Sequence, residues 1–186
     1  MKKCWVCGKD LEVIKDQPYQ YKESGLDSVY LHGIIQYKCS ACGEEAPEIP
    51  NIKELHLLIG KSIICSNDYL SAQEIIYLRK ELGLKSKETA ELLSVTPQEY
   101  SKWENSKDII SSGCDKHLRL LYILNADFET GKVLHSGLRF MQNISLTKKA
   151  ISRTIDKKIA LSVSEWMKPE IPLFNEDCFA SCQEAV

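Results

Sequence analysis

Two short cysteine pairs near the N-terminus constrain the fold of this chain more than any other feature of its sequence. They read Cys4-Trp5-Val6-Cys7 and Cys39-Ser40-Ala41-Cys42, and a glycine follows each. Two residues between thiolates let both sulfurs of a tight turn face one tetrahedral ion, and the glycine permits a positive φ. Four thiolates complete a tetrahedral site, so we expect one structural zinc ion bound by Cys4, Cys7, Cys39 and Cys42.

Three other interpretations of these cysteines are weaker. They could be free thiols in unrelated turns. A redox pair normally begins a helix after a strand, and nothing helical is expected after Cys7 or Cys42. A catalytic zinc keeps an open position, which four thiolates would fill. The 31 residues between the pairs exceed the usual ribbon spacing and predict a β-excursion.

Composition and charge narrow the class of protein. The 186 residues are 44% hydrophobic and 27% charged, which suits a folded chain, and eight cysteines favour metal ligands or free thiols over a disulfide framework. The net charge of −2 argues against non-specific coating of nucleic acid, so DNA binding needs a local site.

No apolar run follows Lys2 and Lys3, and no apolar run in the sequence is long enough for a membrane span. We therefore expect a cytoplasmic protein without a signal peptide or membrane partner.

The first 50 residues are predicted to be rich in β-strand. Alternation marks short strands near Leu11–Val13 and Tyr19–Tyr21, Ser24-Gly25 marks a turn, and 29–37 can supply another strand. A unit of this size cannot bury a sufficient core, so we expect it to depend on the zinc ion.

Helix start signals dominate the middle of the chain. Each of five segments opens with a polar cap residue ahead of apolar residues at helical spacing, and Gly83 is expected to end the second helix. The expected cap residues are, in chain order, Asn51, Ser71, Ser86, Thr96 and Ser112.

The third and fourth of these helices are short and close together. Joined by a tight turn and braced by the helix before them, they predict a helix-turn-helix. In the second of the pair, 97–105, Tyr100 and Trp103 face inward. The outward residues are Gln98, Ser101, Lys102 and Asn105, side chains that can read base edges or reach phosphate. The alternative is an ordinary helical bundle with a polar face.

We therefore predict an α+β protein in which a small zinc ribbon precedes an all-α helix-turn-helix domain. The expected divisions are 1–50 for the ribbon, 51–70 for a connecting helix and linker, 71–125 for the helix-turn-helix, and 126–186 for a partly helical extension of unknown role. Within the extension, 139–158 carries six basic residues and one acidic residue, which suggests either a solvated helix face or an auxiliary phosphate contact.

Several segments together resemble the MqsA-type (YgiT-type) zinc-finger proteins with an XRE-family helix-turn-helix. The resemblance covers roughly residues 1–125 and includes the order of the two modules. The segments are both Cys-x-x-Cys-Gly motifs, YKESGL at 21–26, YKCSACGE at 37–44, IPNIKELH at 49–56, LRKELGL at 78–84 and VTPQEYSKWEN at 95–105. Ser94 and Ser106 stand where this pattern usually has glycine.

The resemblance implies an antitoxin-like bacterial regulator that represses its own promoter and whose zinc module holds a toxin. We expect a homodimer on a near-palindromic double-stranded DNA operator. Matched positions in the pattern imply a structural ion pair between Arg79 and Glu104. The expected DNA-contacting residues are Gln98, Ser101 and Lys102 at bases and Lys87 and Lys107 at phosphates.

Two rival functions remain. The first is a zinc-stapled protein-interaction scaffold whose helix-turn-helix no longer reads DNA, which the low basicity and the outward Glu99 favour. The second is an enzyme. No nucleophile–base pair, phosphate loop or open metal site supports it, so we expect no enzymatic activity.

Overall fold

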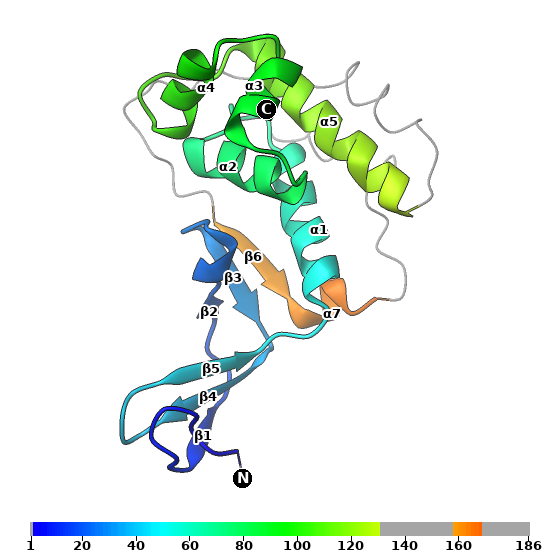
Figure 1. Ribbon diagram of the computed structural model, residues 1–186. Helices are drawn as coiled ribbons and strands as arrows, with labels where there is room; N and C mark the ends of the chain where they lie inside the picture. The colour runs from blue at the N-terminus through cyan, green and yellow to red at the C-terminus, as the bar shows by residue number, and fades with distance from the viewer. Residues whose placement is uncertain (1, 131–157, 169–186) are drawn as a thin grey trace. The chain divides into compact units, whose positions relative to one another are not determined.

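The computed structural model describes residues 2–130 and 158–168 (Figure 1). The chain divides into two compact units, and the division falls within the first long helix. One unit is Met1–Leu55 with Asp156–Ile171, and the other is His56–Ile155 with Pro172–Val186. The first unit holds the described strands and the second holds most of the described helices, so the predicted α+β class is confirmed.

One three-stranded antiparallel sheet carries both cysteine pairs at one end. Its strand order is β1-β4-β5, with β1 at Leu11–Ile14, β4 at Ile35–Cys39 and β5 at Glu45–Glu48. The register pairs Leu11 with Cys39. The second cysteine pair therefore begins at the last residue of the central strand, and the first lies just before β1.

A second sheet of the same unit contains a strand from far along the chain. Its order is β2-β3-β6, with β2 at Tyr19–Gln20, β3 at Val29–His32 and β6 at Ile159–Ser162. A 3-10 turn at Lys22–Ser24, ended by Gly25 with φ of 78°, connects β2 to β3. The sequence predicts one strand within 29–37. The structure has two, β3 and β4, because the chain turns at Gly33, whose φ is 76°.

Strand β6 and the short helix α7, Val163–Trp166, complete the core of the first unit. β6 pairs in parallel with β3, and the register aligns Leu161 with Leu31. Figure 1 shows β6 in orange beside β3 in blue. Trp166 is fully buried, and its indole Nε1 donates to the Pro50 carbonyl at 2.9 Å. Part of the 126–186 extension thus belongs structurally to the cysteine-bearing unit.

The remaining helices follow the predicted order. Their bounds are Ile52–Ile64 for α1, Ala72–Glu81 for α2, Ser86–Leu92 for α3, Pro97–Glu104 for α4 and Ser112–Thr130 for α5. Helices α1 and α5 approach closely at Gly60 and Tyr122. A side chain at position 60 has no room there, since a Cβ on Gly60 would overlap the ring and hydroxyl of Tyr122. Among the described residues, no helix combines the length and apolarity that a membrane span needs.

Two predicted cap residues have the expected geometry. Ser71 Oγ accepts from the Glu74 amide at 3.3 Å while the Glu74 carboxylate accepts from the Ser71 amide at 2.8 Å, which completes a capping box. Thr96 Oγ1 accepts from the Glu99 amide at 3.2 Å, with Pro97 as the first helical residue. These signals are local in the chain, and they fix where α2 and α4 begin.

Two predicted caps need correction, and a third has unusual geometry. The N-cap of α3 is Lys85, whose amide donates to the Glu88 carboxylate, and not Ser86. Ser111, and not Ser112, caps α5, since its Oγ accepts from the Cys114 amide at 3.3 Å. Asn51 lies at the predicted position before α1, and its carbonyl accepts from the Leu55 amide at 3.1 Å. Its φ of 45° is outside the extended region of ordinary N-caps, and its side-chain amide donates to Met167 Sδ.

Candidate metal centre and nucleic-acid interface

The two cysteine pairs form a matched pair of turns. In the first, the Cys4 amide donates to the Lys9 carbonyl, and the Gly8 amide donates to the Cys4 carbonyl, each at 2.8 Å. The second repeats both bonds at 2.8 Å, from Cys39 to Glu44 and from Gly43 to Cys39. The glycines have φ of 73° and 76°, a backbone conformation that disfavours side chains and that these turns require.

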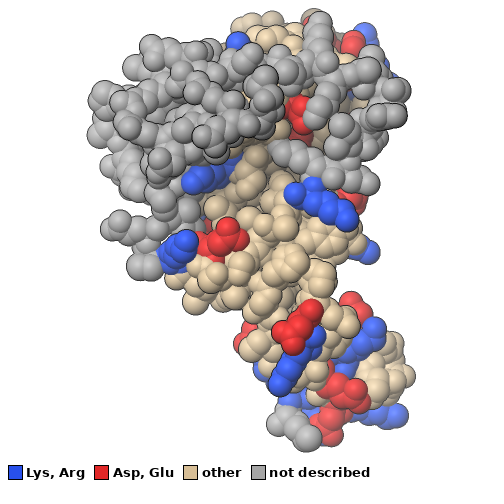
Figure 2. Space-filling view, turned by 180° about the vertical axis from the view of Figure 1, so that it is seen from behind, with Lys and Arg blue, Asp and Glu red and all other residues tan. Residues whose placement is uncertain are grey.

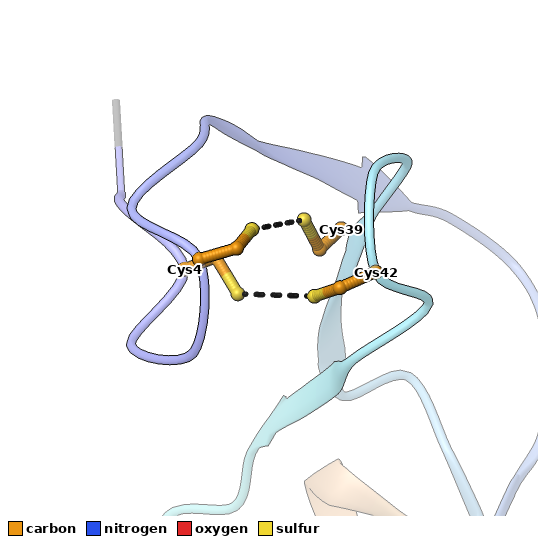
Figure 3. Close-up of side chains that lie close together, drawn as sticks. Cys4, Cys39 and Cys42 are labelled. Atoms are coloured by element: carbon orange, nitrogen blue, oxygen red, sulfur yellow. Dashed lines mark hydrogen bonds between the residues drawn. The ribbon is translucent and has the colours of Figure 1, made fainter.

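The four sulfurs of Cys4, Cys7, Cys39 and Cys42 converge between the turns (Figure 3). All lie within 4.8 Å of one another, and the Cys4–Cys42 and Cys7–Cys39 separations are 3.6 Å and 3.4 Å. A tetrahedral zinc with Zn–S bonds of about 2.3 Å would set its sulfurs about 3.8 Å apart. The donor set and its dimensions therefore fit a tetrahedral thiolate-preferring ion.

The surroundings of these thiols shift their pKa values in opposite directions. Backbone amides of Cys42 and Ala41 donate to Cys39 and lower the pKa of that thiol to about 6. The Glu44 amide lowers the pKa of Cys42, but burial and the neighbouring cysteine sulfurs outweigh it and raise that pKa to about 12. Adjacent thiols resist joint ionisation because their negative charges repel, and a bound cation removes this obstacle.

Several charges on the surface of the first unit are paired with opposite charges. Figure 2 shows Lys, Arg, Asp and Glu interspersed over the lower end of the visible face. Ion pairs of this unit include Lys2–Glu48, Lys3–Asp10 and Lys38–Glu45, which are largely exposed and have separations of 2.7–3.0 Å. Exposed pairs of this kind contribute little stability, and they give this surface no single-sign field.

The α3–α4 pair presents its predicted DNA-contacting residues to solvent. Tyr100 and Trp103 are buried and meet edge to face, with ring centroids 5.9 Å apart, as the inward face of α4 requires. The exposed predicted contacts are Gln98, Ser101 and Lys102 on α4, Lys87 on α3 and Lys107 just after α4. Lys87 Nζ lies 4.0 Å from the Glu91 carboxylate, so a nearby acid partly offsets its charge.

Two serines hold backbone conformations that glycine usually occupies. Ser94, in the turn between α3 and α4, has φ of 57°, and Ser106, after α4, has φ of 55°. Both positions hold glycine in the XRE-family pattern that the sequence resembles. Both serines keep the left-handed backbone conformation. A serine in this conformation is less favourable than a glycine, because its Cβ crowds the backbone.

The structure brings Arg79 and Glu104 together. Arg79 Nε donates to Glu104 Oε1 at 2.6 Å, and the two side chains are 17% and 13% exposed. Arg79 Nη1 also donates to the Leu84 carbonyl at 3.0 Å. One guanidinium thus connects the end of α4 to α2 and to the segment after it.

Sequence reasoning missed a second, more deeply buried ion pair. Asp115 and Arg119 lie one turn apart on α5 with no exposed side-chain surface, and Nε of Arg119 donates to Oδ1 of Asp115 at 2.6 Å. The i, i+4 spacing of opposite charges among apolar residues was the available signal.

Cys65 is disulfide-bonded, so the expectation of metal ligands or free thiols is wrong at that position.

The fold and site define an α+β protein with a four-cysteine candidate metal centre followed by a small helical bundle. Residues 1–127 match the family described as the antitoxin component of bacterial toxin–antitoxin systems, MqsA, and the chain belongs to this family. The match ends before β6 and α7. A comparison with the curated proteins finds no match. The basic segment 139–158 lies outside the described residues, apart from Lys158.

Proposed function

We propose that this protein is a cytoplasmic, DNA-binding antitoxin that represses its own promoter as a homodimer. Family membership supports the antitoxin role, and the exposed polar face of α4 is the observation that carries DNA binding. Pro97 and the Thr96 cap fix the start of this helix, and two buried aromatic side chains fix its rotation. Side chains on the opposite face can then reach DNA in a defined register.

We propose that the four cysteines bind one structural zinc ion. Zinc accepts four thiolates in a closed tetrahedral site, and the soft ligand set disfavours magnesium, calcium and manganese. The ion would join the turn before β1 to the turn between β4 and β5. Its binding free energy would contribute directly to folding of the first unit.

Two half-sites of a near-palindromic operator would each receive one α4 helix in the major groove. Gln98, Ser101 and Lys102 would contact bases, while Lys87 and Lys107 would contact phosphates. Successive major grooves on one face of DNA lie about 34 Å apart, so a homodimer combines the binding free energy of two small contact sets.

Titrations of wild-type protein against duplex DNA from its own upstream region and against scrambled duplex test this proposal. Lys102→Ala should weaken operator binding and relax base preference. Lys107→Ala should weaken binding to both duplexes equally and reduce the salt-dependence slope by about one. Equal, weak binding of wild type to both duplexes would reject sequence-specific DNA recognition.

We also propose that the first unit binds the partner toxin. Exposed apolar side chains support this role, with Trp5 79% and Val13 52% exposed on and near the first cysteine turn. Val6 and Ile35 are also exposed. The test is co-purification of the protein encoded by the neighbouring gene with wild type, Trp5→Ser and Lys9→Ser. Loss of co-purification with Trp5→Ser alone supports the surface. Equal recovery with wild type and both variants rejects it.

The alternative function is an interaction scaffold that does not read DNA. Exposed carboxylates on α3 and α4 favour it, because Glu88, Glu91 and Glu99 would repel phosphates at close range. Under this alternative, the toxin still co-purifies while the upstream and scrambled duplexes bind equally weakly. The two experiments together separate a regulator from a scaffold.

A further inference from the structure

Asn105 and Ser101 form a linked polar pair at the end of α4. Asn105 caps the helix, with its backbone amide directed at the Ser101 and Trp103 carbonyls. Its side-chain Nδ2 donates to the Ser101 carbonyl at 2.7 Å and to Ser101 Oγ at 3.2 Å. Both residues are exposed on the surface that carries Lys102. The pair is therefore held by the helix itself and remains accessible.

The hydrogen bonds fix which atoms of the pair stay available. A carbonyl oxygen only accepts, so the NH2 group of Asn105 must face Ser101 and the Oδ1 atom must face away. Ser101 Oγ accepts one of these bonds, and its own proton finds no acceptor among residues 2–130 and 158–168. Asn105 Oδ1 likewise accepts no hydrogen bond from the described residues. The pair thus leaves one donor on Ser101 and one acceptor on Asn105 available to a ligand.

We propose that Ser101 and Asn105 act together as one reader of adenine in the DNA half-site, an inference that rests on the proposed DNA-binding function. In the major groove, adenine presents an acceptor at N7 and a donor at N6. The Ser101 hydroxyl would donate to N7, and Asn105 Oδ1 would accept from N6. Guanine presents acceptors at both N7 and O6, so it would set two unprotonated oxygens against each other.

This assignment differs from the usual adenine contact of a lone asparagine. That contact needs both the amide nitrogen and the amide oxygen of one side chain at the base edge. Here the nitrogen of Asn105 is engaged by the helix, so Ser101 must supply the donor. Ser101 and Asn105 are consequently expected to specify the same base position, although they are four residues apart.

The test is selection of bound duplexes from a randomised 20-base-pair library by full-length protein, followed by affinity measurements on single-base variants of the selected duplex. The wild-type consensus should hold an adenine in each half-site whose replacement by guanine weakens binding about ten-fold or more. Ser101→Ala and Asn105→Ala should each abolish this preference at that one position. The double variant should be no less selective there than either single variant.

Controls separate base reading from helix stability. Ser101→Ala is compatible with the helix, because alanine is the best helix former, so it remains informative if Asn105→Ala unfolds. Lys107→Ala should weaken binding to every duplex and leave the consensus unchanged. Two outcomes would reject joint reading by Ser101 and Asn105 while leaving DNA binding intact. In the first, the wild-type base preferences survive Ser101→Ala. In the second, the two variants alter preference at different base positions. A wild type that selects no consensus rejects both.

Discussion

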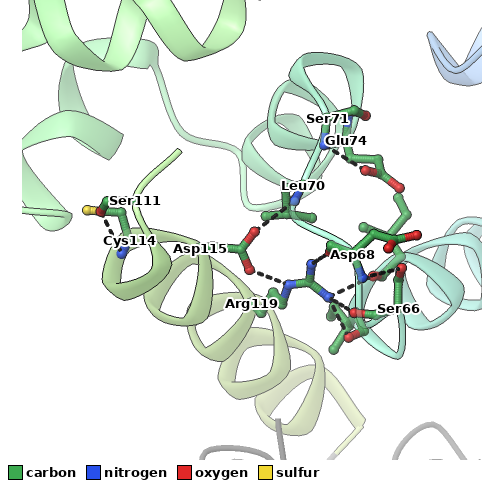
Figure 4. Close-up of polar contacts among 11 residues, drawn as sticks. Ser66, Asp68, Leu70, Ser71, Glu74, Ser111, Cys114, Asp115 and Arg119 are labelled. Carbon is green, nitrogen blue, oxygen red and sulfur yellow. Dashed lines mark hydrogen bonds and ion pairs between the residues drawn. The ribbon is translucent and has the colours of Figure 1, made fainter. Parts of the chain in front are cut away.

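Arg119 and Asp115 form an ion pair with an Nε–Oδ1 distance of 2.6 Å and no exposed side-chain surface (Figure 4). The other guanidinium nitrogens of Arg119 donate to backbone carbonyls at the end of α1 and in the segment before α2, at 2.6–3.1 Å; these are the carbonyls of Ile63, Ile64, Ser66 and Asp68. The second Asp115 oxygen accepts from the Leu70 amide at 2.8 Å. One side-chain pair therefore supplies hydrogen-bond donors to carbonyls at the C-terminus of α1, where helical amides run out.

We expect Arg119→Met to destabilise the helical unit by about 3–5 kcal/mol, because it leaves the buried Asp115 carboxylate without its cation and removes the donors that Arg119 supplies to several carbonyls. Lys87→Met is the matched control. Its ion-pair partner is 4.0 Å away and both side chains are mostly exposed, so the change should stay within about 0.5 kcal/mol. Urea unfolding followed by helical circular dichroism measures both. A loss below about 1 kcal/mol for Arg119→Met would contradict the role assigned to the pair.

Ser106→Gly should stabilise the protein by up to about 1 kcal/mol, since residue 106 has φ of 55° and glycine adopts this conformation without a Cβ penalty. Ser101→Gly is the matched control, because the same replacement inside α4 should destabilise by about 0.5 kcal/mol. Thermal unfolding of both variants provides the comparison. Changes of the same sign would show that backbone conformation does not decide the effect.

Cys39→Ser should remove stoichiometric zinc from the purified protein, whereas Cys114→Ser should retain it. Cys39 is fully buried within the four-sulfur cluster, and Cys114 is a free, partly buried cysteine whose sulfur lies 3.9 Å from the Leu93 carbonyl. Elemental analysis of the two variants and wild type measures the metal. Wild-type protein without zinc, or equal zinc in both variants, would contradict the proposed centre.

Leu161→Asp should open the edge of β3, while Ala160→Asp on the same strand should not. Leu161 is 5% exposed and aligned with Leu31, whereas Ala160 is exposed. Placing a carboxylate at the buried position removes apolar burial and adds an unpaired charge, for a cost of at least about 2 kcal/mol. Hydrogen–deuterium exchange of β3 amides measures the outcome. Equal protection in both variants would show that β6 does not hold this edge.

Local signals in the sequence determined much of this protein. The spacing of each cysteine pair and its following glycine predicted turns that direct two sulfurs to one point. Ser71 and Thr96 marked helix starts correctly, because a cap bonds to amides only a few residues away. The predicted caps at Ser86 and Ser112 are each one residue too far along the chain. A carboxylate in the first turn of α3 and the hydroxyl of Ser111 complete those caps instead.

Only the tertiary structure decided the contacts between distant segments. Ile159–Ser162 pairs with Val29–His32 across more than a hundred residues, and its short alternation does not specify a partner strand. Nothing in the sequence around Arg119 predicts that it bonds to the carbonyls at the end of α1. It reaches them because α5 packs against that end. Local sequence sets where elements begin and which face is apolar. The partners of buried charges and sheet edges follow from packing, because many alternative contacts satisfy the same local pattern.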